Sequence, residues 1–317
     1  MRQSTQKTYS SGEKRYLSFC SQYNLSALPG TEDTLLLFIT YLTGQGLTAN
    51  SIRVYLAAVR AVHINEGYGN PLLDTYRVKK ALRALDIGSK GPKQKLPLTL
   101  DILDKMYPPL PNSGYSLCMW TAMTLAFYGC LRASELTVAA GQFNPNIHLT
   151  NGDVIFNAGL VKPYVSVHIK RSKTDKFNKG FDVVIGCSGH RVCAYCSLLE
   201  YYKLKAITGP VRQDDPFLSV GGFALTKSLL QKETRLQVAR LGLDPSSFSG
   251  HSFRSGSATT AAAAGLADWE IKLLGRWTSD AYQRYIRATP SLLSSFSSRM
   301  SKQQMNDFRL PFISNCI

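Results

Sequence analysis

The chain has little of what marks a membrane protein or a disulfide-rich secreted protein. The longest apolar run, 117–128, is too short to cross a bilayer, and the polar N-terminus MRQSTQKTYS has no signal-peptide core. Seven scattered cysteines, an odd number in 317 residues, argue against a disulfide framework. These absences predict a soluble intracellular protein with no membrane partner, nuclear in a eukaryote and in the cytoplasm or nucleoid of a bacterium.

Acidic residues are also scarce. Against 21 Asp and Glu stand 37 Lys and Arg, which give a formal charge of +16 and a pI near 9.6. Such an excess attracts polyanions, of which nucleic acid is the simplest. The apolar fraction of 44% is that of a globular protein, and the length suffices for two domains.

Apolar residues at helical spacing predict an all-helical first domain over 1–86. The apolar positions of 35–42 form one face and those of 52–62 another. Thr31 and Thr48 stand where N-caps are expected, and the glycines of 67–71 end the second helix.

A basic linker is predicted at 87–97. The segment IGSKGPKQKLP has two glycines, two prolines and three lysines, with no acidic or aromatic residue. This composition is typical of an exposed connection between domains. A solvated tether and a tether lying along a DNA backbone explain it equally well.

The second domain, 98–290, is predicted to mix helices with short strands. A helix begins after Thr99 and a buried one covers 117–128, while alternating apolar residues predict strands at 154–156, 165–169 and 183–185. Helices are expected again at 225–241, 256–265 and 269–274, with a further one carrying Tyr285. The expected fold is mainly α with a small antiparallel β-sheet.

Four segments of this second domain carry polar residues suited to breaking a phosphodiester. They are CLRASEL (130–136), IKRSKTD (169–175), GHSFRSG (250–256) and LLGRWTSDAYQRYIR (273–287). An arginine side chain can grip two phosphate oxygens, and a histidine titrates near neutral pH. His251 and Arg254 are three residues apart, which places both on one face of a helix.

As a set these segments resemble the tyrosine recombinase (phage integrase) family, and the spacing looks most like that in recombinases of eukaryotic mobile elements. The resemblance implies a helical core-binding domain and a catalytic domain that form a clamp around DNA. It also implies cleavage and rejoining through a covalent 3′-phosphotyrosine, without metal, ATP or other cofactor. The implied catalytic residues are Arg132, Lys173, His251, Arg254, Trp277 and Tyr285, supported by Glu135.

Simpler interpretations stand beside several of these assignments. Arg132 can form an ordinary ion pair with Glu135 one helical turn away. Trp277 can be a packing residue, and basic neighbours rival Lys173. Tyr282 competes with Tyr285 as the nucleophile, because the interval from Trp277 to Tyr285 is one residue shorter than in many bacterial and phage relatives.

The expected partner is double-stranded DNA, bound by a homo-oligomer that is most plausibly a tetramer on two sites. Candidate DNA contacts are Arg53, Lys90, Lys93, Lys95, Lys170 and Arg171. The tail, 291–317, can dock on a neighbouring protomer or on its own domain, or be a disordered terminus. A catalytically silent DNA-binding descendant and a monomeric topoisomerase are the alternative functions.

One group of cysteines is left unassigned. Cys187, His190, Cys193 and Cys196 fall within ten residues and include a CxxC, so a zinc site is conceivable. No second ligand pair stands at finger-like spacing, and the last two cysteines precede the apolar run SLLEYY. Packing of buried cysteines is therefore favoured, and no metal is expected.

Overall fold

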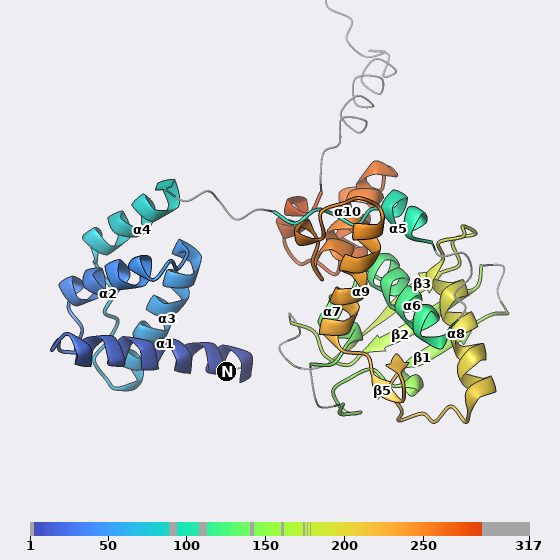
Figure 1. Cartoon of the computed structure of the whole chain (residues 1–317), viewed down its shortest axis with the longest axis horizontal. Coiled ribbons are helices and arrows are strands. Elements are labelled where there is room, and N and C mark those ends of the chain that lie inside the picture. The colour runs from blue at the N-terminus through green and yellow to red at the C-terminus, as the bar shows by residue number, and fades with distance from the viewer. Residues whose placement is uncertain are drawn as a thin grey trace, which may run out of the picture. The chain divides into compact units, whose positions relative to one another are not determined.

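The computed structural model describes residues 3–88, 94–107, 113–139, 143–159, 162–173, 175, 177 and 179–286. The chain divides into two compact units, Met1–Lys93 and Gln94–Ile317 (Figure 1). Two of the predicted DNA contacts, Lys90 and Lys93, and the predicted tail lie outside the described residues.

The first unit consists of helices in its described part. They are α1 (Gln3–Gln22), α2 (Glu32–Gly44), α3 (Ala49–Asn65) and α4 (Tyr76–Gly88). The hydroxyls of Thr31 and Thr48 accept hydrogen bonds from the backbone N–H groups three residues on, so both predicted N-caps are confirmed. The core of the unit is built around Tyr16, Phe19 and Phe38, whose rings lie 5.2 Å apart in two of the three pairs.

The second unit contains the remaining helices and all of the strands in the described chain. Its helices are α5 (Leu100–Met106), α6 (Gly114–Tyr128), α7 (Ala133–Leu136), α8 (Ala194–Thr208), α9 (Lys227–Arg240), α10 (Ser252–Ala263) and α11 (Asp268–Gly275). Short 3-10 helices lie at η1 (Asn151–Asp153), η2 (Pro245–Ser247) and η3 (Asp280–Arg284).

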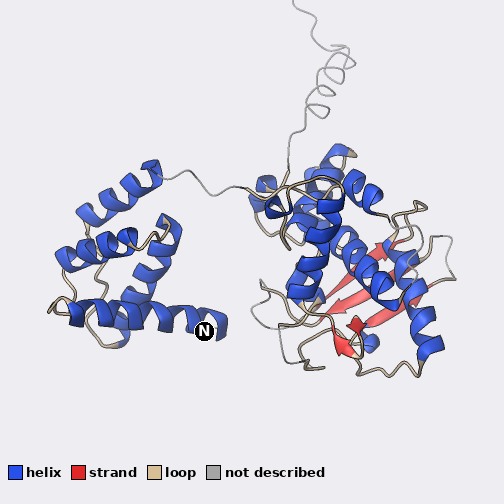
Figure 2. Ribbon diagram, in the orientation of Figure 1, coloured by secondary structure: helices blue, strands red, loops and turns tan. Residues whose placement is uncertain are grey.

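A three-stranded antiparallel sheet covers one part of this unit (Figure 2). Its strands β1 (Val154–Asn157), β2 (Tyr164–Ile169) and β3 (Phe181–Gly186) pair in that order, with Val165 opposite Ile185. Alternate residues of β2 are buried, because successive side chains of a strand point to opposite faces. A two-stranded ribbon is formed by β4 (Ser219–Val220) and β5 (Phe223–Ala224).

Helix α6 is the centre of the second unit. Every residue from Leu117 to Phe127 is buried, and the helix contacts α8, α9 and α10. The inward residues of β2 and β3 belong to the same apolar core. A helix that is apolar on all sides has to be surrounded, and this requirement arranges the later helices about α6.

The end of the predicted linker is bound to the second unit. Leu96 and Leu98 donate backbone hydrogen bonds of 2.8 Å to the carbonyls of Ser247 and Ser252, and Lys95 donates to the Ser246 carbonyl at 2.6 Å. Helix α4 extends to Gly88, so the predicted start at 87 falls within this helix. The first two residues of the predicted 87–97 linker thus belong to helix α4, and Lys95 and Leu96 are exposed while bonded to the second unit.

The expected fold class, mainly α with a small antiparallel sheet, is confirmed, as are the three predicted strands. One element differs. The helix expected to carry Tyr285 is a 3-10 helix that ends at Arg284, with Tyr285 directly after it. None of the described helices is long and apolar enough to span a bilayer.

Helix α10 lies directly against the backbone that enters the second unit. A Cβ built on Gly256 would lie 1.7 Å from the carbonyl oxygen of Leu98, so only glycine permits this approach. The contact joins the strand-like segment before α5 to the helix that carries Arg254.

We expect Gly256→Ala to destabilise the second unit by about 3 kcal/mol or more, since backbone atoms cannot move aside as a flexible side chain would. Thermal unfolding followed by circular dichroism measures the effect. Gly186→Ala is the matched control, because a Cβ there meets no atom within 4 Å. Equal melting temperatures for the two variants would contradict this packing.

Candidate active site

The turn after α6 places Arg132 at the start of α7. Cys130 adopts a left-handed backbone conformation with φ of 46°, which is unusual for a residue with a side chain. Its carbonyl accepts hydrogen bonds from Arg254 Nη1 at 2.6 Å and Arg276 Nη2 at 3.2 Å. The guanidinium groups of Arg254 and Arg276 thus hold the turn that leads to Arg132.

The carboxylate of Glu135 organises the residues around this turn. It accepts hydrogen bonds from the Arg132 backbone at 2.9 Å, from Arg132 Nη1 at 2.8 Å and from Ser172 Oγ at 3.0 Å. Arg276 Nη2 lies 3.5 Å away on its other side. The Glu135 side chain is 2% exposed, so these partners replace the water that the charge would otherwise require.

This network brings Lys173 beside Arg132, although 41 positions separate them in the sequence. Arg132 Nη1 donates to Ser172 Oγ at 2.9 Å, and Lys173 is the next residue in the β2–β3 connection. Ser172 is buried, whereas Lys173 is exposed. The buried serine fixes the loop, and its neighbour keeps a free path to solvent.

His251 is the N-cap residue of α10 and lies at the surface. Partial burial and the nearby cations Lys227, Lys173, Arg132 and Arg254 lower the pKa of its imidazole below the usual value. Cations from α7, α9, α10 and the β2–β3 connection therefore converge on one histidine. The imidazole is mainly neutral at pH 7 and able to accept a proton.

Arg254 is the most buried of the predicted site residues, with 1% of its surface exposed. Its guanidinium donates to the carbonyls of Cys130 and Gly275, and burial lowers its pKa. The indole ring of Trp277 covers it at 4.4 Å. His251 and Arg254 therefore share a helix as predicted but differ sharply in exposure, because the first caps the helix and the second lies inside.

The structure separates the two candidate tyrosines. Tyr282 is 1% exposed in a small core with Ala258, Ala261 and Ile271, and burial raises the pKa of its phenol. Tyr285 is partly exposed, stacks on Trp277 at 5.7 Å, and lies near enough to Arg254 that its phenolate charge would raise the pKa of that guanidinium. Of the two, Tyr285 is the more exposed to solvent.

Three contributors were not predicted from the sequence: Ser172, Lys227 and Arg276. Arg276 has a left-handed backbone with φ of 55° and a half-buried side chain bonded to the Gly129 carbonyl at 2.9 Å. It stands directly before Trp277, and that adjacency is the one signal that a sequence reader could have used. Ser172 stands in the same way directly before Lys173, whereas Lys227 gave no such signal, since only folding brings it to the site.

The predicted DNA contacts in the described chain fall into two groups. Arg53 forms a two-pronged pair with Asp86 at 2.9 and 2.5 Å, and Lys170 pairs with Asp153 at 2.7 Å while donating to the Pro145 carbonyl. Both cations thus have internal partners, which weakens their assignment as phosphate contacts. Arg171 is exposed, and Lys95 is exposed despite its bond to Ser246.

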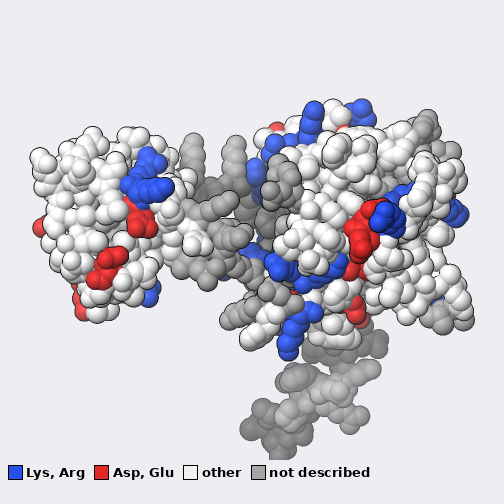
Figure 3. Space-filling view, turned by 90° about the horizontal axis from the view of Figure 1, so that it is seen from below, with Lys and Arg blue, Asp and Glu red and all other residues white. Residues whose placement is uncertain are grey.

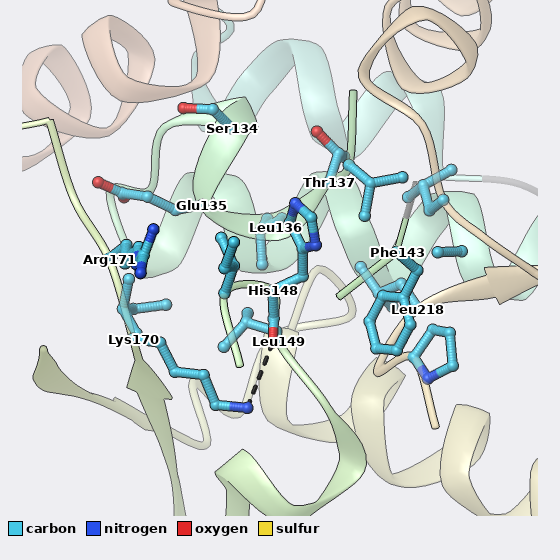
Figure 4. A pocket seen from close by; sticks show the side chains of 16 residues that line it. Ser134, Glu135, Leu136, Thr137, Phe143, His148, Leu149, Lys170, Arg171 and Leu218 are labelled. Atoms are coloured by element: carbon cyan, nitrogen blue, oxygen red, sulfur yellow. Dashed lines mark hydrogen bonds between the residues drawn. The ribbon is translucent and has the colours of Figure 1, made fainter. Parts of the chain in front are cut away.

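A cavity of about 110 Å³ is lined by Glu135, Lys170 and Arg171, among other residues (Figure 4). Arg171 and Glu135 lie along one wall, and Lys170 extends below them to the His148 carbonyl at 3.3 Å. In Figure 3, basic side chains gather on one part of the larger unit, and a neighbouring part carries both signs. The cavity is too small for a nucleotide.

The known proteins to which this chain is similar are described as recombinases and integrases. No family model matches the chain. Over 269 residues it is 26% identical to the integrase/recombinase XerD homolog of Selenomonas ruminantium, which covers 81% of this chain and 73% of that protein.

Two solved structures share the fold. The XerH site-specific recombinase in its post-cleavage complex with a palindromic difH substrate has a TM-score of 0.64 at 17% identity, covering 93% of this chain and 79% of that one. A lambda integrase tetramer bound to a Holliday junction has a TM-score of 0.56 at 17% identity, covering 90% and 72%.

The charge around His251 gives a testable prediction. Replacing Lys227 by Gln removes the strongest cationic influence on the imidazole, so the protonated form becomes easier to reach and the pKa of His251 rises. A pH titration of the His251 ring signals by NMR measures it. Lys232→Gln, on the exposed side of α9, should leave the midpoint unchanged; an equal shift in both variants would argue against a local contact.

Proposed function

We propose, from the similarity of this chain to a curated integrase/recombinase and from the fold that it shares with solved recombinases, that it is a tyrosine-type site-specific recombinase acting on duplex DNA. In the proposed reaction one strand is cut to leave a 3′-phosphotyrosine and a free 5′-hydroxyl. The covalent bond conserves the energy of the phosphodiester, so rejoining needs no ATP.

The convergence of Arg132, Lys173 and Arg254 on His251 is the observation that supports this proposal most. One buried carboxylate, Glu135, accompanies these cations, which leaves the site with an excess of positive charge. Such a site favours a bound phosphate and the further negative charge that develops during displacement.

Tyr285 is the proposed nucleophile. Its phenolic oxygen attacks phosphorus while the bond to the 5′-oxygen breaks, and the phenolic proton passes to a base for which neutral His251 is the candidate. Lys173 is the proposed acid that protonates the leaving 5′-oxygen, since its exposed ammonium follows the anchored Ser172. Tyr285 gives one proton to His251, and the leaving 5′-oxygen receives one proton from Lys173, so the step balances.

Arg132 and Arg254 are proposed to bind the non-bridging oxygens of the scissile phosphate. Arg132 is 17% exposed and already oriented by Glu135. Arg254 lies beneath Trp277, so contact with phosphate requires the segment from Trp277 to Tyr285 to shift. The same shift would free the tyrosine. Trp277 is proposed as a further donor to a phosphate oxygen through its indole N–H.

The proposed partner is double-stranded DNA, bound by a tetramer on two sites, by analogy with the lambda integrase tetramer. The charge of +16 predicts strongly salt-dependent binding. A silent DNA-binding descendant is the alternative, and it would be expected to have lost at least one of the polar groups that are all present here.

Covalent capture tests the nucleophile. The purified chain is mixed with a random library of nicked duplexes in EDTA, denatured with SDS, and the DNA retained on protein is sequenced. Tyr285→Phe should abolish retention with affinity nearly unchanged, because one hydroxyl adds little to an interface of many phosphate contacts.

Tyr282→Phe is the matched control, and it should retain DNA as the native chain does. Retention that survives in Tyr285→Phe and disappears in Tyr282→Phe would reverse the assignment. Salt-sensitive binding with no retained DNA in any variant would favour the silent descendant.

Arg254→Lys should slow cleavage of a captured site by about 10²–10³, because lysine cannot bond both backbone carbonyls and a phosphate as a planar guanidinium can. Single-turnover cleavage of a nicked substrate measures the rate, and a melting curve checks the fold. Arg235→Lys, exposed on α9, controls for loss of a guanidinium. Cleavage within a few-fold of native would remove Arg254 from the site.

A further inference from the structure

Three cysteines meet where β3 connects to α8. Cys187 directly follows β3, Cys193 is the N-cap residue of α8, and Cys196 lies in the first turn of that helix. Their sulfur atoms all lie within 4.8 Å of one another. Among the described residues, no other group of three histidine, cysteine or acidic side chains is placed to hold an ion.

The distances between the sulfurs match a tetrahedral metal site. Cys187 Sγ lies 3.7 Å from Cys196 Sγ and 3.8 Å from Cys193 Sγ. Thiolates bound to zinc at about 2.3 Å in a tetrahedron lie about 3.8 Å apart. A disulfide requires about 2.05 Å, so the observed separations fit three ligands of one ion and no sulfur–sulfur bond.

Backbone N–H groups orient one of these sulfurs. Ser188 and Cys196 donate to Cys193 Sγ at 3.4 and 3.5 Å. Hydrogen bonds of this kind favour a thiolate and fix its direction, which is the support that metal ligands commonly receive from their surroundings. The turn between β3 and α8 is therefore arranged around sulfur.

The burial pattern differs from that of packing cysteines. Cys193 is 1% exposed, as the packing interpretation expects, but Cys187 and Cys196 lie at the surface. Two exposed thiols beside a buried one add nothing to a hydrophobic core, whereas they give an ion a path to the site. The packing interpretation therefore holds for Cys193 alone.

We propose that Cys187, Cys193 and Cys196 bind a zinc ion as three thiolate ligands. The fourth coordination position of the zinc is assigned to water. His190 is turned elsewhere, since its Nδ1 accepts a hydrogen bond from the Val192 N–H at 3.1 Å and its Nε2 lies 3.8 Å from Asp104. The proposal stands apart from the recombinase function and does not depend on it.

Such an ion would fasten the end of β3 to the start of α8. Strand β3 belongs to the hairpin whose connection carries Lys173, and α8 contacts the central helix α6. Binding in the folded state alone stabilises that state, so the zinc is a structural clamp on the sheet and takes no part in the phosphoryl transfer.

The test uses the full chain without an affinity tag, expressed with added zinc and purified under a thiol reductant. Elemental analysis should find about one zinc per chain. Replacement by Co²⁺ should give the sulfur-to-metal charge-transfer band and the strong visible bands of a tetrahedral thiolate site. Removal of the ion with a strong chelator should lower the melting temperature by several degrees, and added zinc should restore it.

Cys187→Ser and Cys196→Ser are the decisive variants, because both residues are exposed and the fold does not need their side chains for packing. Each should lose the zinc and the cobalt bands. Cys316→Ser, which also removes one thiol, should keep both, and His190→Ala should keep them because water fills the fourth position.

Three results would overturn the proposal. They are zinc-free native protein that gives no cobalt spectrum, zinc retained equally by Cys187→Ser and Cys196→Ser, and a Cys187–Cys196 disulfide without metal. Loss of zinc from His190→Ala would overturn the assignment of water. Metal content and absorption are read without DNA, so failure here is distinguishable from failure of the recombinase proposal.

Discussion

The buried carboxylate of Glu135 is the interaction on which the site depends. It binds Arg132 twice, holds the β2–β3 connection through Ser172, and faces Arg276 on its third side. Breaking a buried ion pair from one side costs about 3–5 kcal/mol, since the remaining charge has lost its water. One side chain thereby links α7, the sheet and the end of α11.

The rest of the site accumulates positive charge that this carboxylate cannot balance. The pKa of His251 is lowered by burial and then by four neighbouring cations, and that of Arg254 is lowered by burial first, with Arg132 as the one cation that adds to the effect. Folding tolerates this repulsion because the large apolar core around α6 stabilises the unit. A bound phosphate would relieve it, which is the arrangement expected of a site built for an anion.

Residues 276–285 combine two tasks in ten positions. Arg276, which has a left-handed backbone, bonds to the carbonyls of Gly129 and Cys130. Trp277 stacks on Arg254, which bonds to the same Cys130 carbonyl. These two neighbouring side chains thus reach the turn at Cys130, Arg276 directly and Trp277 by way of Arg254.

The sequence by itself determined most of the secondary structure and the inventory of polar groups. Thr31 and Thr48 cap helices, and the alternation in 165–169 makes a strand, because these features depend on neighbours a few residues away. The short ion pair of Arg132 with Glu135 is equally local. Such contacts are encoded in spacing and can be predicted from it.

Only the tertiary structure decided which groups meet. Lys227 reaches His251 from another helix, Ser172 reaches Glu135 from the sheet, and burial separates Tyr282 from Tyr285. The tertiary structure also brings the sulfur of Cys187 to within 3.7 Å of that of Cys196 while leaving both residues exposed to solvent. Distance and exposure depend on how the whole chain packs. Spacing in the sequence brought the cysteines to notice, but it did not show which sulfurs meet or which side chains stay in solvent.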